Sequence, residues 1–160
     1  MPNEKSSLLA GRNTAPLSPE EIRRAINTFL GLDNHVNAKH DPGARTAFHV
    51  REDESGGHYG EIVFGADIYP GSSVVDPNAA LSLDAAAAHE LTHHYRWKDK
   101  IALSEVKLMH VDEALTSLQA IFRYDRKLSD TDIRQLIADA IQRLQLFVLE
   151  QTETEAEEIG

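Results

Sequence analysis

The segment His89-Glu90-Leu91-Thr92-His93 carries the residues of this chain best suited to chemistry. It places two imidazoles four residues apart, and on an α-helix positions i and i+4 lie one above the other on the same face. Two neutral histidines at that spacing can bind one divalent metal ion between them. Glu90 then lies beside the ion rather than on it, which is the position of a general base for a metal-activated water. The motif therefore predicts a small zinc hydrolase, most simply a peptidase.

The composition limits the ligands and partners that such a site can use. The chain has 160 residues, which suits one domain. It contains no cysteine, so a metal must be bound by His, Asp or Glu, a set that fits a catalytic site better than a structural one. The formal net charge of −10 disfavours nucleic acid as a partner. No apolar run approaches the roughly 20 residues that cross a bilayer, and the N-terminus lacks a signal-peptide core, so we expect a cytoplasmic protein without a membrane partner.

The elements around the motif predict an α+β fold. Residues 46–51 and 61–69 alternate as strands on either side of a Gly-rich turn at 54–57, which predicts a short antiparallel sheet. Helical spacing or capping signals occur in four stretches, at residues 18–30, 83–98, 105–126 and 129–150. We therefore expect the sheet to pack on an active-site helix pair, with additional N- and C-terminal helices.

The polar ends of the chain suggest the domain boundaries. We expect residues 1–17 to form a disordered leader, residues 18–150 a single domain, and the acidic residues 151–160 a flexible tail. The last predicted helix carries one apolar stripe, which we interpret as core packing without chemistry: Ile133, Leu136, Ile137, Ala140, Ile141, Leu144 and Phe147.

A catalytic zinc needs a third protein ligand and one open coordination position. Glu113 follows His93 by 20 residues and lies in the next predicted helix. The connection between the two helices is short, so they should be antiparallel neighbours, and Glu113 could reach the metal. Asp112 is a competing ligand, but it points about 100° away around the helix. Two His and one Glu with an open position suit Zn²⁺, although Fe²⁺ or Mn²⁺ could use the same ligands.

The motif followed at this separation by Glu113-Ala114 resembles the thermolysin-type gluzincin metallopeptidases. The resemblance implies a zincin-like fold in which His89, His93 and Glu113 bind zinc and Glu90 polarises the attacking water. The chain's size is more similar to minimal single-domain gluzincins, or to the ImmA/IrrE-type regulatory peptidases, than to a two-domain secreted enzyme.

The segment 62–67 is similar to the edge strand of that family, which pairs with an extended substrate backbone. This resemblance implies substrate contacts at Val63, Gly65 and Asp67. With no second domain in the pattern, the chain supplies one wall of the cleft, and a partner protein could complete it.

The chain departs from the family's pattern at two places. The family often has Asp four residues after the ligand Glu, where it fixes the tautomer of a metal-bound His, and this chain has Ser117 there. Larger members take a transition-state His from a C-terminal domain, whereas no His follows His110 here. His110 lies one turn before Glu113, so it is a candidate for an oxyanion donor, a supporting contact or a substitute ligand. The alternative for His110 is a partly exposed helix side chain without a role in catalysis.

These observations predict a zinc metallopeptidase that hydrolyses a peptide bond in a specific intracellular protein or peptide, alone or inside a complex. Two alternatives remain open. The chain could be a zinc-binding regulatory or structural module without turnover, or an interaction module in which the motif is accidental.

Overall fold

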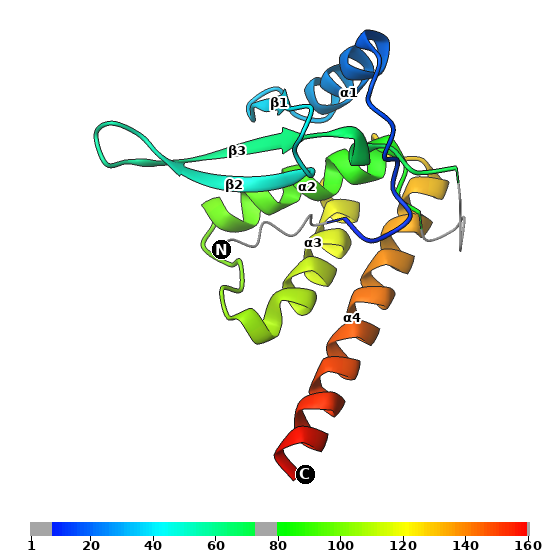
Figure 1. Ribbon diagram of the computed structural model, residues 1–160. Coiled ribbons are helices and arrows are strands. Elements are labelled where there is room, and N and C mark those ends of the chain that lie inside the picture. The colour runs from blue at the N-terminus through cyan, green and yellow to red at the C-terminus, as the bar shows by residue number, and fades with distance from the viewer. Residues whose placement is uncertain (1–7, 73–79, 160) are drawn as a thin grey trace.

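The computed structural model describes residues 8–72 and 80–159 of the chain (Figure 1). They form an α+β fold, as the sequence predicts. In chain order the elements are α1 (Pro19–Leu32), β1 (Ala38–His40), β2 (Ala47–Glu52), β3 (His58–Phe64), the 3-10 helix η1 (Ala66–Ile68), α2 (Leu83–Lys98), the 3-10 helix η2 (Val106–Leu108), α3 (Met109–Arg123) and α4 (Asp130–Ile159). None of these helices is long and apolar enough to span a membrane.

The sheet is mixed, with the strand order β1-β3-β2. β2 runs antiparallel to β3, with Ala47 opposite Val63, as predicted. β1 runs parallel to β3, with Ala38 opposite Ile62, which corrects the prediction of a purely antiparallel sheet. A strand of three residues is too short to show alternation, so the sequence predicts only a polar connection there. As a consequence β3 is the central strand and β2 lies at an edge.

α1 begins where its capping signal predicts. The Ser18 hydroxyl accepts a hydrogen bond from the backbone N–H of Glu21, and the Glu21 carboxylate accepts one from the N–H of Ser18. The helix buries Ala25 and Phe29, and the Phe29 ring lies 5.9 Å from the ring of Phe64 in β3, measured between centroids. Through this face α1 packs against α2 and β1.

α2 is the central helix of the domain. The Ser82 hydroxyl caps it by accepting a hydrogen bond from the N–H of Ala85. The four alanines at 85–88 and Leu91 are fully buried, because neighbours pack around the whole first half of the helix. The sheet lies on one side of α2, and α3 and α4 pack on the other (Figure 1). The motif that starts at His89 is therefore enclosed between layers.

The predicted leader divides into two parts. Residues 1–7 lie outside the described residues. Residues 8–17 pack on the domain, where Leu8 is buried and Arg12 forms an antiparallel bridge with Pro70. The expectation of disorder is therefore wrong for this second part, because long-range backbone pairing holds it in place.

α4 differs from its prediction at its end and in its buried face. It continues to Ile159, through most of the predicted flexible tail, because no Gly or Pro interrupts it and Glu favours helix. Within the predicted core stripe, Leu136 and Ala140 are buried. Three other members of the stripe are exposed instead: Ile137, Ile141 and Leu144. α4 therefore packs on the domain through a face that includes the polar residues Asp139 and Arg143.

Candidate metal centre

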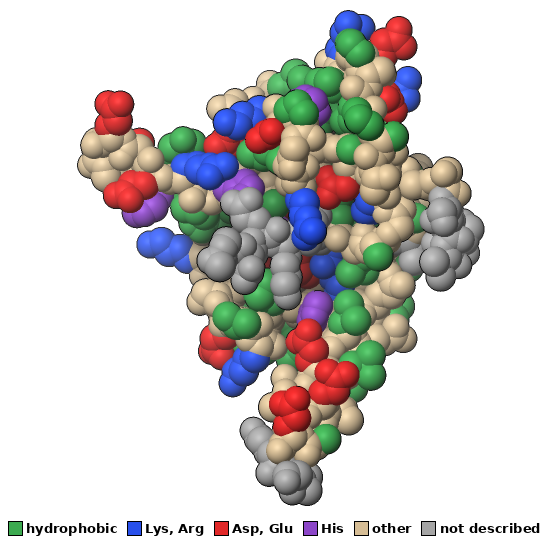
Figure 2. Space-filling view, in the orientation of Figure 1, with side chains coloured by type: hydrophobic (Ala, Val, Ile, Leu, Met, Phe, Trp, Pro, Cys, Tyr) green, Lys and Arg blue, Asp and Glu red, His purple; other side chains and the backbone are tan. Residues whose placement is uncertain are grey.

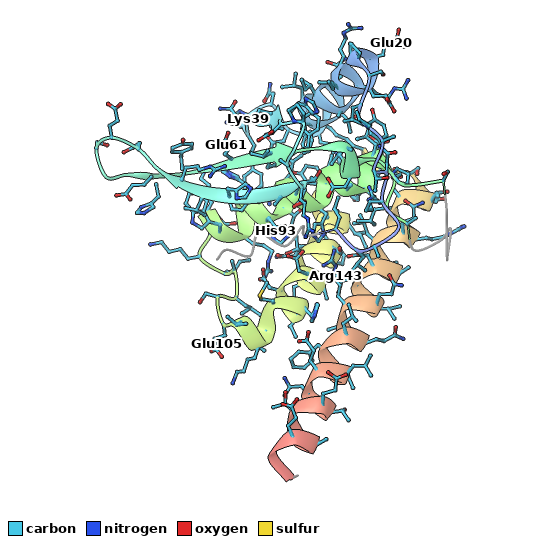
Figure 3. All side chains as sticks on the ribbon, viewed as in Figure 1. Glu20, Lys39, Glu61, His93, Glu105 and Arg143 are labelled. Atoms are coloured by element: carbon cyan, nitrogen blue, oxygen red, sulfur yellow. The ribbon has the colours of Figure 1, made fainter. Side chains whose placement is uncertain are left out.

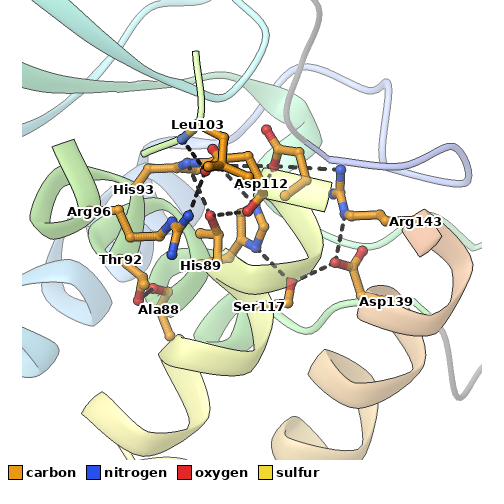
Figure 4. Close-up of polar contacts among 12 residues, drawn as sticks. Ala88, His89, Thr92, His93, Arg96, Leu103, Asp112, Ser117, Asp139 and Arg143 are labelled. Atoms are coloured by element: carbon orange, nitrogen blue, oxygen red, sulfur yellow. Dashed lines mark hydrogen bonds and ion pairs between the residues drawn. The ribbon is translucent and has the colours of Figure 1, made fainter. Parts of the chain in front are cut away.

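Two histidines and one glutamate meet where α2 packs on α3 (Figure 4). His89 and His93 lie one turn apart on α2, and Glu113 comes from the second turn of α3. The Oε1 atom of Glu113 lies 2.8 Å from Nε2 of His89 and 2.9 Å from Nε2 of His93. The two Nε2 atoms are 3.1 Å apart. The structure thus brings together all three predicted ligands as a group that could hold a metal ion.

The spacing of these three atoms fits a small divalent cation. Tetrahedral zinc with bonds of about 2.0–2.1 Å holds its ligand atoms about 3.3–3.4 Å apart, so the side chains need to separate by only a few tenths of an ångström. His89 is fully buried, whereas the side chains of His93 and Glu113 keep 12% and 18% of their surface exposed. Access from solvent is therefore on the side of His93 and Glu113.

A serine and an aspartate fix the tautomer of His89. Nδ1 of His89 lies 2.8 Å from Oγ of Ser117, and the same hydroxyl donates to Oδ2 of Asp139 over 2.6 Å. Since a hydroxyl has a single hydrogen, Oγ of Ser117 must accept from Nδ1–H of His89. Nε2 of His89 then presents its lone pair at the ligand position. Asp139 of α4 supplies, through Ser117, the carboxylate that the sequence lacks four residues after Glu113.

Arg143 links that carboxylate to the third ligand. Its Nε donates to Oδ2 of Asp139 over 2.7 Å, and its Nη1 lies 3.5 Å from Oε1 of Glu113. Arg143 and Asp139 are both buried, so their charges are weakly screened. Figure 3 shows Arg143 of α4 and His93 of α2 in the same central region of the molecule. The centre is therefore built from three helices rather than the two that the sequence indicates.

The charge of the centre without a metal resides on a histidine–carboxylate pair. Burial alone disfavours protonation of His93, but the charge of Glu113 and a hydrogen bond to it outweigh burial and raise the pKa of His93 to about 9. Burial acts to raise the pKa of Glu113, yet the charge of His93 holds it well below its usual value. Burial lowers the pKa of His89, which favours the neutral ring that a metal requires.

Asp112, the competing ligand, has a structural role. Its Oδ1 accepts a hydrogen bond from Nη2 of Arg96 over 2.7 Å and another from the backbone N–H of Leu103 over 2.9 Å. These bonds brace the connection between α2 and α3, where Lys100 adopts a φ of 61°. The Asp112 carboxylate is therefore bonded away from the histidines, and the carboxylate that lies against them is that of Glu113.

Glu90, the predicted general base, is fully buried on α2 beside His89. Arg12 lies in the electrostatic field of this carboxylate. Burial lowers the pKa of Arg12 to about 10, although the charges of Asp67, Asp139 and Glu90 act in the opposite direction. The Arg12 side chain is held by hydrogen bonds to the backbone carbonyls of Asp67, Ile68 and Leu81. The guanidinium of Arg12 is therefore a fixed positive charge near Glu90, the predicted general base.

His110 does not join the ligands. Its Nε2 lies 2.9 Å from Oε1 of Glu150 on α4, at the partly exposed outer side of α3. No contact among the described residues connects His110 with the three ligands. The geometry therefore gives no support to its predicted roles as an oxyanion donor or a substitute ligand, because the turn that separates it from Glu113 carries it toward α4.

The predicted substrate-binding residues lie inside the domain. Val63 is buried in the central strand, and at Gly65 a Cβ atom would lie 1.9 Å from the backbone oxygen of Ala44. The Asp67 carboxylate accepts hydrogen bonds from N–H and Oγ1 of Thr46, at 2.9 Å and 2.6 Å. The expectation of an edge strand at residues 62–67 is therefore wrong, since residues 62–64 belong to the central strand β3 and residues 66–67 lie in η1.

Sequence reasoning missed the three charged residues that support the site. Asp139 and Arg143 stand four residues apart in an amphipathic helix, and that spacing is a detectable signal of an ion pair along the helix. Arg12 gives no comparable signal, because its partners are backbone carbonyls more than fifty residues away.

The chain has no significant match among protein-family models, curated protein sequences or solved structures. The geometry of the metal centre is therefore the ground for assigning a function.

Proposed function

We propose that this protein is a zinc-dependent metallopeptidase of the gluzincin type, with a zincin-like arrangement of its helices. The observation that carries the proposal is the convergence of His89, His93 and Glu113, whose ligand atoms lie within 3.1 Å of one another. When bound, zinc supplies a Lewis acid that polarises a carbonyl and lets water attack it near neutral pH.

Each of the neighbouring residues then has a separate role in hydrolysis. Glu90 accepts a proton from the attacking water as its oxygen bonds to the peptide carbon, and it delivers the proton to the departing nitrogen as the C–N bond breaks. Ser117 and Asp139 keep the lone pair of His89 on the metal side.

We propose that the substrate binds at the outer edge of β2, which pairs with no further strand among the described residues. An extended peptide can add to a free sheet edge through backbone hydrogen bonds, and β2 is an edge strand that lies against α2. Phe48 of β2 contacts His94, the residue after a metal ligand, with 5.8 Å between ring centroids. The substrate is a protein or peptide, and a partner protein could supply the opposite wall of the cleft.

One observation favours a second function, a zinc-binding regulatory module without turnover. His89 and Glu90 have no exposed surface, and closed metal sites are more often structural than catalytic. Both functions require zinc, so bound zinc would exclude a chance motif. Peptide cleavage would then distinguish the peptidase from the regulatory module.

The test measures metal and cleavage on the same samples. We expect one zinc per chain by elemental analysis in the wild type and in Glu90→Gln, and loss of zinc in His93→Ala. Cleavage of a quenched fluorescent peptide library should occur with the wild type and disappear with Glu90→Gln. Zinc without cleavage in any sample would support the regulatory module, and absence of zinc from the wild type would refute both functions.

A further inference from the structure

A pocket of about 270 Å³ opens between the second half of α2 and the end of α3, and we call it the α2–α3 pocket. Its lining includes Tyr95 and Asp99 at the end of α2, Gln119 and Arg123 of α3, and Ile101 of the connection between the two helices. The three ligands of the candidate metal centre do not line it. Its volume is that of about nine water molecules and lies below the roughly 300–1,000 Å³ of pockets for drug-sized ligands, so it suits a small molecule.

Arg123 provides a fixed positive charge at this pocket. Its guanidinium carbon lies 3.5 Å from the ring centroid of Tyr95, and the Tyr95 hydroxyl donates a hydrogen bond to Oδ2 of Asp33, which holds the ring in place. The other polar contacts of Arg123 are with the neutral hydroxyls of Tyr95 and Tyr124. No carboxylate among the described residues forms an ion pair with Arg123. Its paired N–H donors match the geometry of a carboxylate.

Gln119 provides a second donor, one turn before Arg123 on the same face of α3. Its Oε1 accepts a hydrogen bond from Nη1 of Arg96 over 2.6 Å. Because a guanidinium can only donate, this bond fixes the orientation of the amide and leaves its NH₂ group to donate to a ligand. Arg96 also lines the pocket, but it is buried and paired with Asp112 over 2.7 Å, so this pair adds no net charge.

Asp99 provides a negative charge at the same pocket. It ends α2, and its side chain is exposed. Within the described part of the chain, neither Arg123 nor any other basic side chain forms an ion pair with Asp99. A cation and an anion that line one small pocket without pairing with each other are complementary to a molecule that carries both charges.

Two apolar side chains line the pocket beside these charges. Phe122 is 81% exposed and Ile101 is 46% exposed. A ligand with an apolar group would cover part of this surface, which favours binding. The lining therefore combines two donors for a carboxylate, an acceptor for a cation and an apolar surface.

The charge of the whole chain disfavours a simple anion in this pocket. The formal net charge is −10, and Figure 2 shows acidic side chains gathered toward the C-terminal end of α4. A field of this sign repels anions from the protein. It acts only weakly on a zwitterion, because such a molecule has no net charge.

We propose that the α2–α3 pocket binds a free α-amino acid with an apolar side chain. The carboxylate of the ligand accepts hydrogen bonds from Arg123 and from the NH₂ group of Gln119, and its ammonium group pairs with Asp99. Its side chain packs on Ile101 and Phe122. Such a ligand pairs both charges of the pocket at once, whereas a carboxylate or an amine alone pairs only one. The site does not depend on the metal centre or on the proposed function.

Isothermal titration calorimetry of the wild-type protein with L-leucine tests the proposal directly, and we expect one site per chain. Two analogues each lack one charge: 4-methylpentanoate has no ammonium group, and 3-methylbutylamine has no carboxylate. Each should bind roughly 10–100-fold more weakly than L-leucine, the range expected for a lost hydrogen bond to a charged group. L-Alanine should also bind more weakly, because it has no side chain to cover Ile101 and Phe122.

Two substitutions assign the charges of the ligand to their partners. Asp99→Asn should weaken L-leucine by at least about tenfold without weakening 4-methylpentanoate, which has no group for Asp99 to bind. Arg123→Met should weaken L-leucine by a similar factor without weakening 3-methylbutylamine. The matched controls Asp125→Asn and Arg126→Met change exposed residues that do not line the pocket, and they should bind L-leucine as the wild type does. Circular dichroism shows that each variant folds.

Three results would each overturn the proposal. The first is a wild type that binds neither L-leucine nor L-phenylalanine. The second is binding of inorganic phosphate or 4-methylpentanoate as tightly as L-leucine, which would indicate a site for simple anions. The third is L-leucine binding that Asp99→Asn or folded Arg123→Met leaves unchanged.

Discussion

Removal of one hydroxyl, in Ser117→Ala, tests how α4 supports the metal centre. The substitution deletes the oxygen that accepts from Nδ1–H of His89 at 2.8 Å and that donates to Asp139 at 2.6 Å. Both partners are fully or almost fully buried, so water cannot easily replace the lost bonds. A buried donor left without its acceptor costs about 1–3 kcal/mol. If that cost falls on the metal-bound geometry, the zinc dissociation constant should rise roughly 10–100-fold, the range found for partners of metal-binding histidines.

Competition with a chromophoric zinc chelator measures this change, and urea unfolding of the metal-free protein measures any general destabilisation. Asp139→Asn should weaken zinc binding in the same direction, because it removes the charge at the end of the same hydrogen-bonded chain. The double variant should cost less than the sum of the two single variants, since both act through one path. A Ser117→Ala protein that binds zinc within twofold of the wild type would refute the role assigned to this path.

Three further predictions concern Glu90, Asp112 and His93. Glu90→Gln should keep zinc and lose cleavage by at least about 100-fold in kcat, which peptide hydrolysis checks. Asp112→Ala should destabilise the fold by about 3–5 kcal/mol in urea unfolding, because it leaves the buried charge of Arg96 without its carboxylate partner. Unchanged stability would contradict the bracing role. In the metal-free protein the raised pKa of His93 adds stability that is fully present below about pH 6.5 and is lost as pH rises through about 9. The free energy of unfolding of the wild type should therefore exceed that of His93→Gln by less and less across that range, as measured by urea titrations.

The helices were the part of the fold most open to sequence reasoning. α1 is capped at Ser18, the first residue of the predicted stretch 18–30, and α2 coincides with the predicted stretch 83–98, because capping and helix spacing are local properties. The sheet was predicted less well. β1 has three residues and no alternation, so its parallel pairing with β3 arises only from tertiary contacts. That pairing makes β3 the central strand, so the edge predicted at residues 62–67 is not an edge of the sheet.

α4 shows why an apolar pattern does not by itself locate a core. Its stripe of Ile and Leu predicts burial, yet the helix buries Asp139 and Arg143 beside Leu136 and leaves Ile141 exposed. The charged pair is buried because Ser117 and the ligand carboxylate of α3 satisfy it there. Hydrophobic spacing cannot reveal partners that come from another helix.

The sequence by itself determined the three side chains that converge, because an i, i+4 pair and a short helix connection fix geometry over a few turns. Only the tertiary structure decided what surrounds them. The carboxylate behind His89, the cation near Glu90 and the solvent-facing side of α4 all depend on which distant segments pack together. Such packing minimises the free energy of the whole domain, and no local stretch of residues specifies it.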